Sequence, residues 1–430
     1  MSTYGAALRV VHVNALESYG GAAKAAHRLH LGLRTIGIDS KMLVRDKSSS
    51  DDSVVQVNKG LKTLSGLTMH FGYQIDRQPL KIYKGYSANS PWSLNWLTND
   101  IAKQAQALAP HIVHLHWIGQ GFVPIQALRR FNQPLIWTLH DSWAFTGGCH
   151  IPHDCTNYQT HCGNCPQLGS GRERDLSNWL WHKKEASWRN TKMTIVTPSR
   201  WLADCARASS LFANRRIEII PYGLDLNVYR PIDRLEARRL LGLPTDRKLI
   251  LFGAVSSTTD TNKGFHLLKP ALHSLANQWK DSADVVIFGA SSSSDDSGTG
   301  LTSHYLGYLH DDLTLALMYS AADVSVVPSL SENLPFTVLE SLACGTPAVA
   351  FRVGGIPDLI EDRQNGYLAN PFDTDDLAHG IEWVLEDSER RTQLGLRARQ
   401  KVETAFETRN TARQYQTLYT EVLNDKPAGI

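Results

Sequence analysis

The sequence carries little net charge, no long hydrophobic run and few cysteines. Its 430 residues include 44 Lys and Arg against 42 Asp and Glu, which gives a formal net charge of +2. This balance argues against binding through bulk positive charge, so we expect no nucleic-acid partner. No apolar run reaches about 18 residues, the length that a transmembrane helix needs. Residues 1–5 lack the basic and apolar regions of a signal peptide, and we expect a soluble, cytoplasmic protein.

The six cysteines are too few to hold a chain of this length together as a disulfide scaffold. The composition is that of a globular protein, with 42% hydrophobic and 20% charged residues. At roughly 150 residues per domain, the length predicts two large domains.

Short runs rich in β-branched residues alternate with helical patterns along most of the chain, which predicts parallel α/β sheets. The runs are apolar throughout, as expected for strands that are covered on both faces. The expected strands are 9–13, 112–116, 135–139, 194–197, 217–220, 249–252, 285–288, 324–327 and 348–351. The expected helices are 22–35, 99–108, 265–277, 313–320, 336–343, 377–385 and 391–423.

A stretch with three prolines and no long apolar strand, 221–244, separates two such series and is the best candidate for an interdomain connection. We therefore expect a first Rossmann-like domain at 1–221, with a Cys-rich insertion near 143–180, and a second at 222–405. A C-terminal helix at 406–430 is expected to pack back on the first domain. Ligands of open α/β sheets bind at the carboxyl ends of the strands, so the functional residues should follow strands in a cleft between the domains.

Two features of the first half follow expected strands. Gly20 and Gly21 precede a helix, where paired glycines and a helix N-terminus suit an anion, although a plain tight turn is equally compatible. His140 ends the strand at 135–139 and is placed to meet a substrate hydroxyl, or else it caps the strand end. The full G-x-G-x-x-G fingerprint of dinucleotide-binding proteins is absent.

The second half has a lysine and two glutamates in corresponding places. Lys263 follows the strand at 249–252 and opens a helix, a position that suits a diphosphate, while a solvated surface lysine is the alternative. Glu332 and Glu340 lie eight residues apart around a Pro-marked helix start. Glu340 falls on an otherwise apolar helix face, where a carboxylate is costly without a partner such as vicinal hydroxyls. A capping or surface acid is the alternative for Glu340.

The segment 328–340 resembles the E-x7-E signature of retaining glycosyltransferases with the GT-B fold, of the large family 4 type. Further segments carry the same resemblance: SLACGTP at 341–347, GGIPD at 354–358, NGY at 365–367, VTPS at 196–199, PYGLD at 221–225 and the glycines at 20–21. The stretch HDSW at 140–143, followed by clustered cysteines, is similar to transferases that assemble bacterial exopolysaccharide, including colanic-acid-type enzymes.

The resemblance implies roles for individual residues. Glu340 matches the glutamate that holds the nucleotide ribose, and Glu332 matches the one beside the transferred sugar. The backbone amides from Asn333 through Leu334 and Pro335 to Phe336 match a segment that meets sugar hydroxyls and phosphate. Lys263 matches the lysine that neutralises the departing diphosphate, and His140 matches a histidine beside the donor sugar. Gly20 and Gly21 match a loop that faces the acceptor and the diphosphate.

One position departs from the family pattern. The family often has Gly-Arg after the first strand of the second domain, but this chain has Gly253-Ala254 and no arginine before Lys263. Another cation takes that role, or Lys263 acts with helix dipoles alone. For this family a same-face attack is usually proposed, so we do not assign Glu332 as a nucleophile.

Four cysteines fall within 17 residues, namely Cys149, Cys155, Cys162 and Cys165. The last two form a C-x2-C pair, the spacing that lets two thiolates share one metal. We expect a structural zinc, with a redox pair or unliganded thiols as alternatives. Four thiolates leave no open position, so the zinc is not expected to be catalytic.

An aromatic and basic stretch within 71–96 suggests contact with a membrane surface or a lipid-linked acceptor, although an insertion packed on its own domain is the commoner case. Such contact would place the protein at the inner face of the membrane.

As a whole, the resemblance implies a hexosyltransferase-type enzyme (EC 2.4) that uses a UDP- or GDP-sugar. Its acceptor would be a glycan or lipid-linked glycan in cell-surface polysaccharide biosynthesis, with no cofactor needed for catalysis. A sugar-nucleotide epimerase or phosphorylase of the same fold remains open, and so does a non-catalytic zinc-ordered binding protein.

Overall fold

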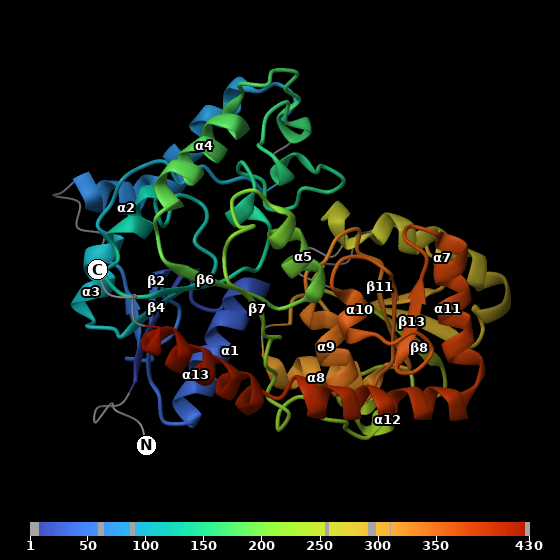
Figure 1. Cartoon of the computed structure of the whole chain (residues 1–430). Helices are drawn as coiled ribbons and strands as arrows, with labels where there is room; N and C mark the ends of the chain where they lie inside the picture. Colours follow the sequence, from blue (N-terminus) through green and yellow to red (C-terminus); the bar gives the residue numbers. More distant parts are fainter. Residues whose placement is uncertain are drawn as a thin grey trace. The chain divides into compact units, whose positions relative to one another are not determined.

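The computed structural model of the protein describes residues 8–58, 64–86, 91–253, 258–290, 298–309 and 311–425. The chain forms two compact units, each built around its own parallel sheet (Figure 1). Unit 1 comprises Met1–Gly223 and Arg409–Ile430, and unit 2 comprises Leu224–Thr408. The sequence predicts the first boundary two residues earlier, after residue 221.

Unit 1 contains seven parallel strands in the order β3-β2-β1-β4-β5-β6-β7. They are β1 (Arg9–Leu16), β2 (Asp39–Asp46), β3 (Val54–Gln56), β4 (Ile112–Leu115), β5 (Leu135–Thr138), β6 (Met193–Thr197) and β7 (Ile217–Ile219). The chain runs outward from β1 to β3 and then returns to β4 on the other side of β1. In open α/β sheets, ligands bind outside the carboxyl ends of the strands at such a reversal.

The helices of unit 1 fill the connections between these strands, except for α13, which follows unit 2 in the chain. They are α1 (Gly21–Thr35), α2 (Leu64–Asp76), α3 (Ile101–Ala107), α4 (Leu176–Trp188), α5 (Arg200–Ala208) and α13 (Thr408–Asn424). Short 3-10 turns lie at Gln78–Ile82, Ile125–Arg130, Trp143–Phe145, Asn157–Gln159 and Pro166–Leu168. Helix α1 buries Ala26, Leu29 and Leu33, whose spacing of three and four residues places them on one face.

Helix α13, from the end of the chain, packs against the same face of the unit 1 sheet as α1 (Figure 1). Its Tyr415 and Tyr419 are buried in one cluster with apolar residues of β1, β4, β5 and β6. The Tyr419 hydroxyl pairs with His114 Nδ1 at 2.8 Å, and the Tyr415 hydroxyl pairs with Thr138 Oγ1 at 2.8 Å. The end of the chain is therefore an integral part of unit 1.

Unit 2 contains six parallel strands in the order β10-β9-β8-β11-β12-β13. They are β8 (Lys248–Gly253), β9 (Ala283–Phe288), β10 (Thr302–Tyr305), β11 (Val324–Val327), β12 (Ala348–Phe351) and β13 (Gly366–Ala369). The helices are α6 (Arg234–Leu241), α7 (Phe265–Trp279), α8 (Asp312–Ala321), α9 (Phe336–Ala343), α10 (Ile356–Leu359), α11 (Thr374–Glu386) and α12 (Ser388–Ala405), with a 3-10 turn, η6, at Thr261–Lys263. The strand order reverses between β8 and β11.

All nine strands expected from the sequence are present, with ends that differ by at most a few residues. The single helix expected over 391–423 is wrong, because α12 ends at Ala405 and α13 begins at Thr408. The backbone between them pairs with Leu224 instead: the Leu224 amide donates to Phe406 O at 2.8 Å, and the Thr408 amide donates to Leu224 O at 3.1 Å. These bonds with a distant residue take the backbone out of the helical path.

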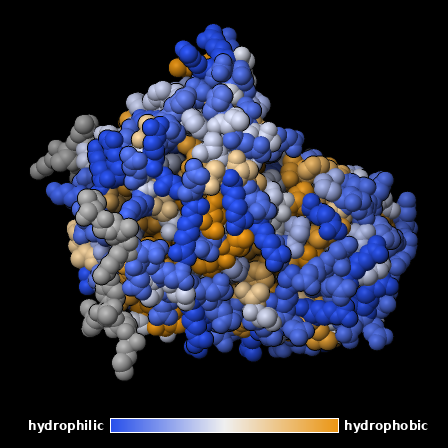
Figure 2. All heavy atoms as spheres, viewed as in Figure 1, coloured by the Kyte–Doolittle hydropathy of each residue, from blue (hydrophilic) through white to orange (hydrophobic). Residues whose placement is uncertain are grey.

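Within the described ranges, no helix combines the length and the apolar character that crossing a bilayer requires. The face seen in Figure 2 is mostly hydrophilic, and its hydrophobic atoms gather in separate areas.

Candidate functional site

In unit 2, an ion pair joins the loops that follow β8 and β11, the two strands at the reversal. Lys263 Nζ lies 2.7 Å from Glu332 Oε1. The neighbouring backbone holds the same loops together, since Asn262 Nδ2 donates to Ser331 O at 2.9 Å and the Leu330 amide donates to Asn262 O at 2.9 Å. The structure thus brings together two residues that the sequence singled out 69 positions apart.

Two glycines allow this close packing. Gly264 has φ +73°, and a Cβ there would lie 1.8 Å from Pro328 O. Gly354 has φ +53°, and a Cβ there would lie 1.9 Å from Glu332 O. Both positions combine a left-handed backbone with a contact that only glycine permits, so the Glu332 loop is fixed from both sides.

Helix α9 begins directly after this loop. Pro335 is its N-cap residue and supplies no side-chain cap, so the positive end of the helix is not offset by a capping carboxylate or hydroxyl. The segment Asn333–Phe336 leads into α9 directly after Glu332, the ion-pair partner of Lys263. This arrangement is suited to an anion.

Glu340 lies one turn into α9, on the buried face, and is only 3% exposed. The Tyr319 hydroxyl of α8 donates to Glu340 Oε2 at 3.2 Å. Burial and the nearby Glu340 carboxylate raise the pKa of Tyr319 well above its ordinary value, so the phenol keeps its proton and remains a donor. The apolar face predicted around Glu340 is confirmed, because Val338, Leu339 and Leu342 are all fully buried.

Lys263 carries a positive charge at neutral pH. Burial alone would lower its pKa, but the Glu332 carboxylate outweighs burial and the pKa is raised above its ordinary value. Lys263 is therefore a cation beside Glu332, which lies three residues before Pro335, the N-cap residue of α9.

In unit 1, the two glycines after β1 lie at the start of α1. Gly20 is the N-cap residue with φ +86°, and α1 has no side-chain cap. A Cβ at Gly20 or Gly21 would meet no atom within 4 Å, so neither glycine is required by neighbouring packing. Nearby Glu17 turns away to accept from the Ser49 amide at 2.9 Å and from Ser48. The loop leaves its backbone open around the start of α1.

His140 lies after β5, at the carboxyl end of the same sheet. Its Nε2 pairs with His116 Nδ1 at 3.2 Å, and its Nδ1 pairs with the Tyr222 hydroxyl at 2.8 Å. Burial lowers the pKa of His140 to about 4, although the adjacent Asp141 acts in the opposite direction. His140 is therefore a neutral imidazole at pH 7, and both of its nitrogens already pair with groups of unit 1.

The carboxylate of Asp141 is held by three donors. Its Oδ2 accepts from Trp117 Nε1 at 2.8 Å and from His150 Nδ1 at 2.6 Å, and its Oδ1 accepts from the Trp143 amide at 2.9 Å. Burial would raise the pKa of Asp141, but His150 and these hydrogen bonds lower it, so the group stays ionised. His150 is anchored in turn by Ser93 Oγ, 2.8 Å from its Nε2. This network fixes the loop that carries His140.

Two family profiles match the chain in succession. Residues 19–228 match "Glycosyltransferase Family 4", and residues 233–401 match "Glycosyl transferases group 1". A D-inositol 3-phosphate glycosyltransferase of Geodermatophilus obscurus is 34% identical over 336 residues, which cover 74% of this chain and 68% of the relative. The chain is a group 1 glycosyltransferase.

Solved structures agree with this glycosyltransferase in fold. Sucrose-phosphate synthase from Thermosynechococcus elongatus superimposes with a TM-score of 0.69 at 20% identity, covering 97% of this chain and all of that one. Anabaena HepE, solved in complex with UDP and glucose, superimposes with a TM-score of 0.64 at 15% identity over 96% of this chain and all of that one. The GT-B fold expected from the sequence is confirmed, and so is the transferase class.

The four clustered cysteines of the glycosyltransferase are free thiols, and all except Cys155 are buried. Burial raises the pKa of Cys162 to about 12, which keeps that thiol protonated in the absence of a metal. In the described ranges, the group of three or more candidate ligands with donor atoms within 4.8 Å of one another consists of histidines and contains no cysteine. Zinc at the four thiols stays a prediction.

The buried Lys184 of α4 donates to Thr146 O at 2.9 Å and lies 3.8 Å from the centre of the Trp143 ring.

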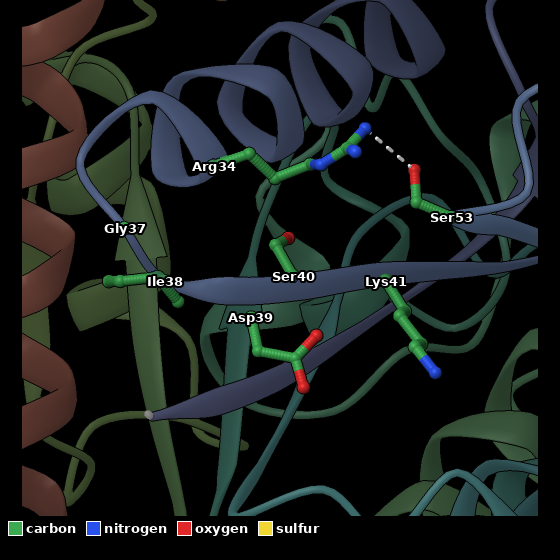
Figure 3. A pocket seen from close by; sticks show the side chains of 7 residues that line it. All are labelled: Arg34, Gly37, Ile38, Asp39, Ser40, Lys41 and Ser53. Atoms are coloured by element: carbon green, nitrogen blue, oxygen red, sulfur yellow. Dashed lines mark hydrogen bonds between the residues drawn. The ribbon is translucent and has the colours of Figure 1, made fainter. Parts of the chain in front are cut away.

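A pocket of about 330 Å³ lies at the amino end of β2, away from the strand ends that carry the candidate residues. Arg34 bonds to Ser53 at 3.0 Å, while Asp39 and Lys41 point to the other side of the strand (Figure 3). Asp39 also pairs with Arg9 at 3.0 Å. Since the charged groups of this pocket do not converge, we assign it no ligand.

His116 and Tyr222, the hydrogen-bond partners of His140, were not predicted from the sequence. A signal for His116 was present, because it follows an otherwise apolar run that also contains His114. Position 254, where the family often has arginine, lies outside the described residues. Within the described residues the roles of the candidate side chains remain predictions.

Proposed function

We propose that this glycosyltransferase moves a sugar from a nucleoside diphosphate sugar to a glycan or lipid-linked glycan acceptor, with retention of the anomeric configuration. The observation that carries the proposal is the cluster in unit 2. It combines the Lys263–Glu332 ion pair, the start of α9 and a buried carboxylate on the same helix.

Lys263 and the start of α9 bind the diphosphate. Negative charge grows on the diphosphate as its bond to the sugar breaks, so a fixed cation and a helix dipole stabilise the transition state more than the ground state. On donor binding, the phosphate oxygens take the place of Glu332 beside Lys263. The released carboxylate then accepts hydrogen bonds from the transferred sugar.

Glu340 binds the ribose. A carboxylate that is 3% exposed needs hydrogen-bond donors, and Tyr319 supplies one of them. The two vicinal hydroxyls of a ribose are donors that a carboxylate can accept. The donor nucleotide is therefore a ribonucleotide.

In the reaction, the bond between the anomeric carbon and the diphosphate oxygen breaks, and the acceptor oxygen bonds to the same face of that carbon. The proton of the acceptor hydroxyl passes to the departing diphosphate. Glu332 is not assigned as the nucleophile, because this same-face attack by the acceptor oxygen needs no covalent intermediate on the protein. His140, which is neutral, lies beside the donor sugar, and Gly20 and Gly21 contact the acceptor and the diphosphate.

Positive charge at the phosphates comes from the protein itself, so we propose that catalysis needs no metal ion. Activity retained in excess EDTA would support this assignment. The donor is a UDP- or GDP-sugar: the related fold of HepE was solved with UDP and glucose. The name of the 34% identical relative mentions D-inositol 3-phosphate. This compound should therefore be tested as an acceptor beside the glycans.

We further propose that unit 1 touches the inner face of a membrane through α2. Leu67, Phe71 and Ile75 are exposed at intervals of four residues on this helix, and Lys81 and Lys84 follow it. A stripe of apolar residues next to basic ones suits the headgroup region of an anionic bilayer. Phe71→Glu should reduce sedimentation with phosphatidylglycerol vesicles. Leu240→Glu, at a more exposed leucine of unit 2, should leave it unchanged.

Melting temperatures in the presence of UDP, GDP, ADP, dTDP and CMP provide the first test of the donor site. A ligand at about 100 times its dissociation constant stabilises the folded protein by about 2.7 kcal/mol. We expect selective stabilisation by UDP or GDP that is lost in Glu340→Ala. Stabilisation that persists in this variant would contradict the ribose assignment.

Transfer is tested by incubating the matching nucleotide sugars with membrane-extracted glycan, or with D-inositol 3-phosphate, and by reading the anomeric configuration by NMR. Inversion would contradict the proposed mechanism. Release of nucleotide without acceptor glycosylation would favour the epimerase, and use of inorganic phosphate would favour the phosphorylase. A protein that binds no nucleotide would favour the zinc-ordered binding protein.

A further inference from the structure

A row of imidazole rings crosses the unit 1 sheet on the face that α1 and α13 cover. It runs from His12 on β1, through His114 and His116 on and after β4, to His140 after β5. His12 is the register partner of His114, and His116 lies two residues further along on the same face. All except His140 are fully or almost fully buried. Four histidines on one buried face are more than packing requires, since histidine offers less apolar surface than the surrounding residues.

Three of these rings form a continuous hydrogen-bonded chain. His12 Nδ1 pairs with His116 Nε2 at 2.9 Å, and His116 Nδ1 pairs with His140 Nε2 at 3.2 Å. The chain continues from His140 Nδ1 to the Tyr222 hydroxyl at 2.8 Å. At the inner end, His12 Nε2 is buried and has no hydrogen-bond partner.

Burial keeps this chain neutral. It lowers the pKa of His12 and of His116 well below the ordinary value, and the neighbouring imidazoles act in the same direction. A neutral imidazole has one N–H and one lone pair, so each ring that donates on one side must accept on the other. The tautomers of the three rings are therefore coupled, and only two directions of the chain are allowed.

The inner end selects between the two directions. In the first, every ring carries its proton on Nε2, and the Nε2–H of His12 is a buried donor without a partner. In the second, every ring carries its proton on Nδ1, and only a lone pair is left unpaired. Among backbone groups, orphaned buried N–H donors are rarer than under-satisfied acceptors, and the same preference applied to the ring nitrogens favours the second direction. His140 then donates from Nδ1 to the Tyr222 oxygen, so the hydroxyl proton of Tyr222 points away from His140.

A metal site explains the cluster less well. His12, His114 and His116 have donor atoms within 4.8 Å of one another, which suits an ion. However, His114 pairs through both nitrogens, with Tyr419 and Thr138 at 2.8 Å each. His116 is also paired through both nitrogens. A metal would have to replace several hydrogen bonds that are already formed.

We propose that His116, supported by His12, is a positioning residue that holds His140 in the Nδ1–H tautomer toward Tyr222. The proposal rests on the proposed function in one respect, namely that His140 lies beside the reacting sugar. The other titratable groups facing the chain are His30 of α1, His114 of β4, Asp141 beside His140, and Tyr415 and Tyr419 of α13. Of these only Asp141 is charged at pH 7, and its three donors hold it in place.

The tautomer is read directly from ¹⁵N chemical shifts of histidine-labelled protein, with His140→Gln used to assign the signal. We expect an Nδ1–H signal for His140 in the wild type and a mixture of tautomers in His116→Phe. An Nε2–H signal in the wild type would overturn the proposal. This measurement needs no substrate, so it remains decisive even if no transfer activity is found, a result that would count against the proposed function alone.

Kinetics separate positioning from simple packing. His116→Phe should lower kcat about 10-fold or more and change the donor KM little, because the hydrogen bond that orients His140 is lost. The matched control is His114→Phe, two residues earlier and also buried but outside the hydrogen-bonded chain, which should lower the melting temperature without lowering kcat. Equal losses of kcat in both variants would overturn the proposal.

Two further measurements complete the test. If His116→Phe does not fold, His116→Gln is measured in the same two ways, with the same expected mixture of tautomers. Stoichiometric metal in the purified protein that disappears in His12→Phe would also overturn the proposal, since the rings would then be ligands.

Discussion

Replacing Glu340 by glutamine removes a negative charge from a buried side chain while keeping its size. The carboxylate is 3% exposed, and Tyr319 donates to it at 3.2 Å. In the proposed complex it also accepts hydrogen bonds from the two ribose hydroxyls. Glu340→Gln keeps one acceptor oxygen and replaces the other by an amide that donates, so the ribose loses both the charge and one acceptor.

The expected loss follows from the strengths of these bonds. A hydrogen bond to a charged group contributes about 1.5–3 kcal/mol, against about 0.5–1.5 kcal/mol for a neutral pair. Two weakened bonds therefore cost about 2–3 kcal/mol, which corresponds to about a 30- to 150-fold weaker binding of the nucleotide. The ribose is remote from the bond that breaks, so the donor KM should rise more than kcat falls.

Titration calorimetry with the free nucleoside diphosphate measures this loss. Tyr319→Phe is the control, because it leaves the carboxylate in place and removes only its internal donor, with an expected change below about 10-fold. Wild-type affinity in Glu340→Gln would refute the ribose assignment. An equal loss in both variants would show that packing around α9, and not the charge, governs binding.

Four further outcomes are expected. Lys263→Ala should lower kcat about 100-fold or more, with partial recovery in Lys263→Arg, as measured by steady-state transfer. Gly264→Ala should destabilise unit 2 by about 3 kcal/mol or more in urea unfolding, because its Cβ would lie 1.8 Å from Pro328 O at φ +73°. Gly242→Ala, which has a similar φ but open space around its Cβ, should cost less. Burial lowers the pKa of Lys184 to about 7 from 10.5, so between pH 7 and about 8.5 the unfolded chain binds a proton that the folded protein has released. The free energy of unfolding should therefore rise with pH in the wild type and rise less in Lys184→Met; parallel curves would contradict this shift. Elemental analysis should find one zinc per chain that a strong chelator removes with a fall in melting temperature, and a zinc-free protein with full stability would exclude the four-thiol site.

The fold was predictable where the burial of a strand on both faces left a continuous apolar run in the sequence. Three of the four strands that were missed, β3, β10 and β13, are edge strands. Most residues of β3 and β10 are not buried, so these strands need less apolar surface, whereas β13 is buried but begins with Gly366, a residue type that is depleted in strands. The fourth, β2, lies inside the sheet but carries Asp39, Lys41, Arg45 and Asp46, which hide its apolar centre. The break between α12 and α13 was not predictable, because it depends on backbone pairing with Leu224, nearly two hundred residues earlier.

Lys263, Glu332 and Glu340 could be singled out as candidates because each lies in a short sequence pattern. Glu332 and Glu340 lie within one loop and one helix, and Lys263 occupies a recognisable helix start, so short patterns contain all three. The surroundings of His140 were not predictable in the same way. His116 follows β4 and Tyr222 follows β7, and only the folded sheet brings their ring nitrogen and hydroxyl to His140.

The path of the chain has a consequence for the construction of hybrid enzymes. The chain leaves unit 1 after Gly223 and returns to it at Arg409, so unit 1 is assembled from two separate pieces of sequence. Tyr415 and Tyr419 fill the sheet face around His114 and Thr138. A graft that exchanges the first half of this enzyme for that of a relative would leave these tyrosines opposite a foreign sheet. An exchange of unit 1 between relatives should therefore move α13 together with the N-terminal half, through two junctions instead of one.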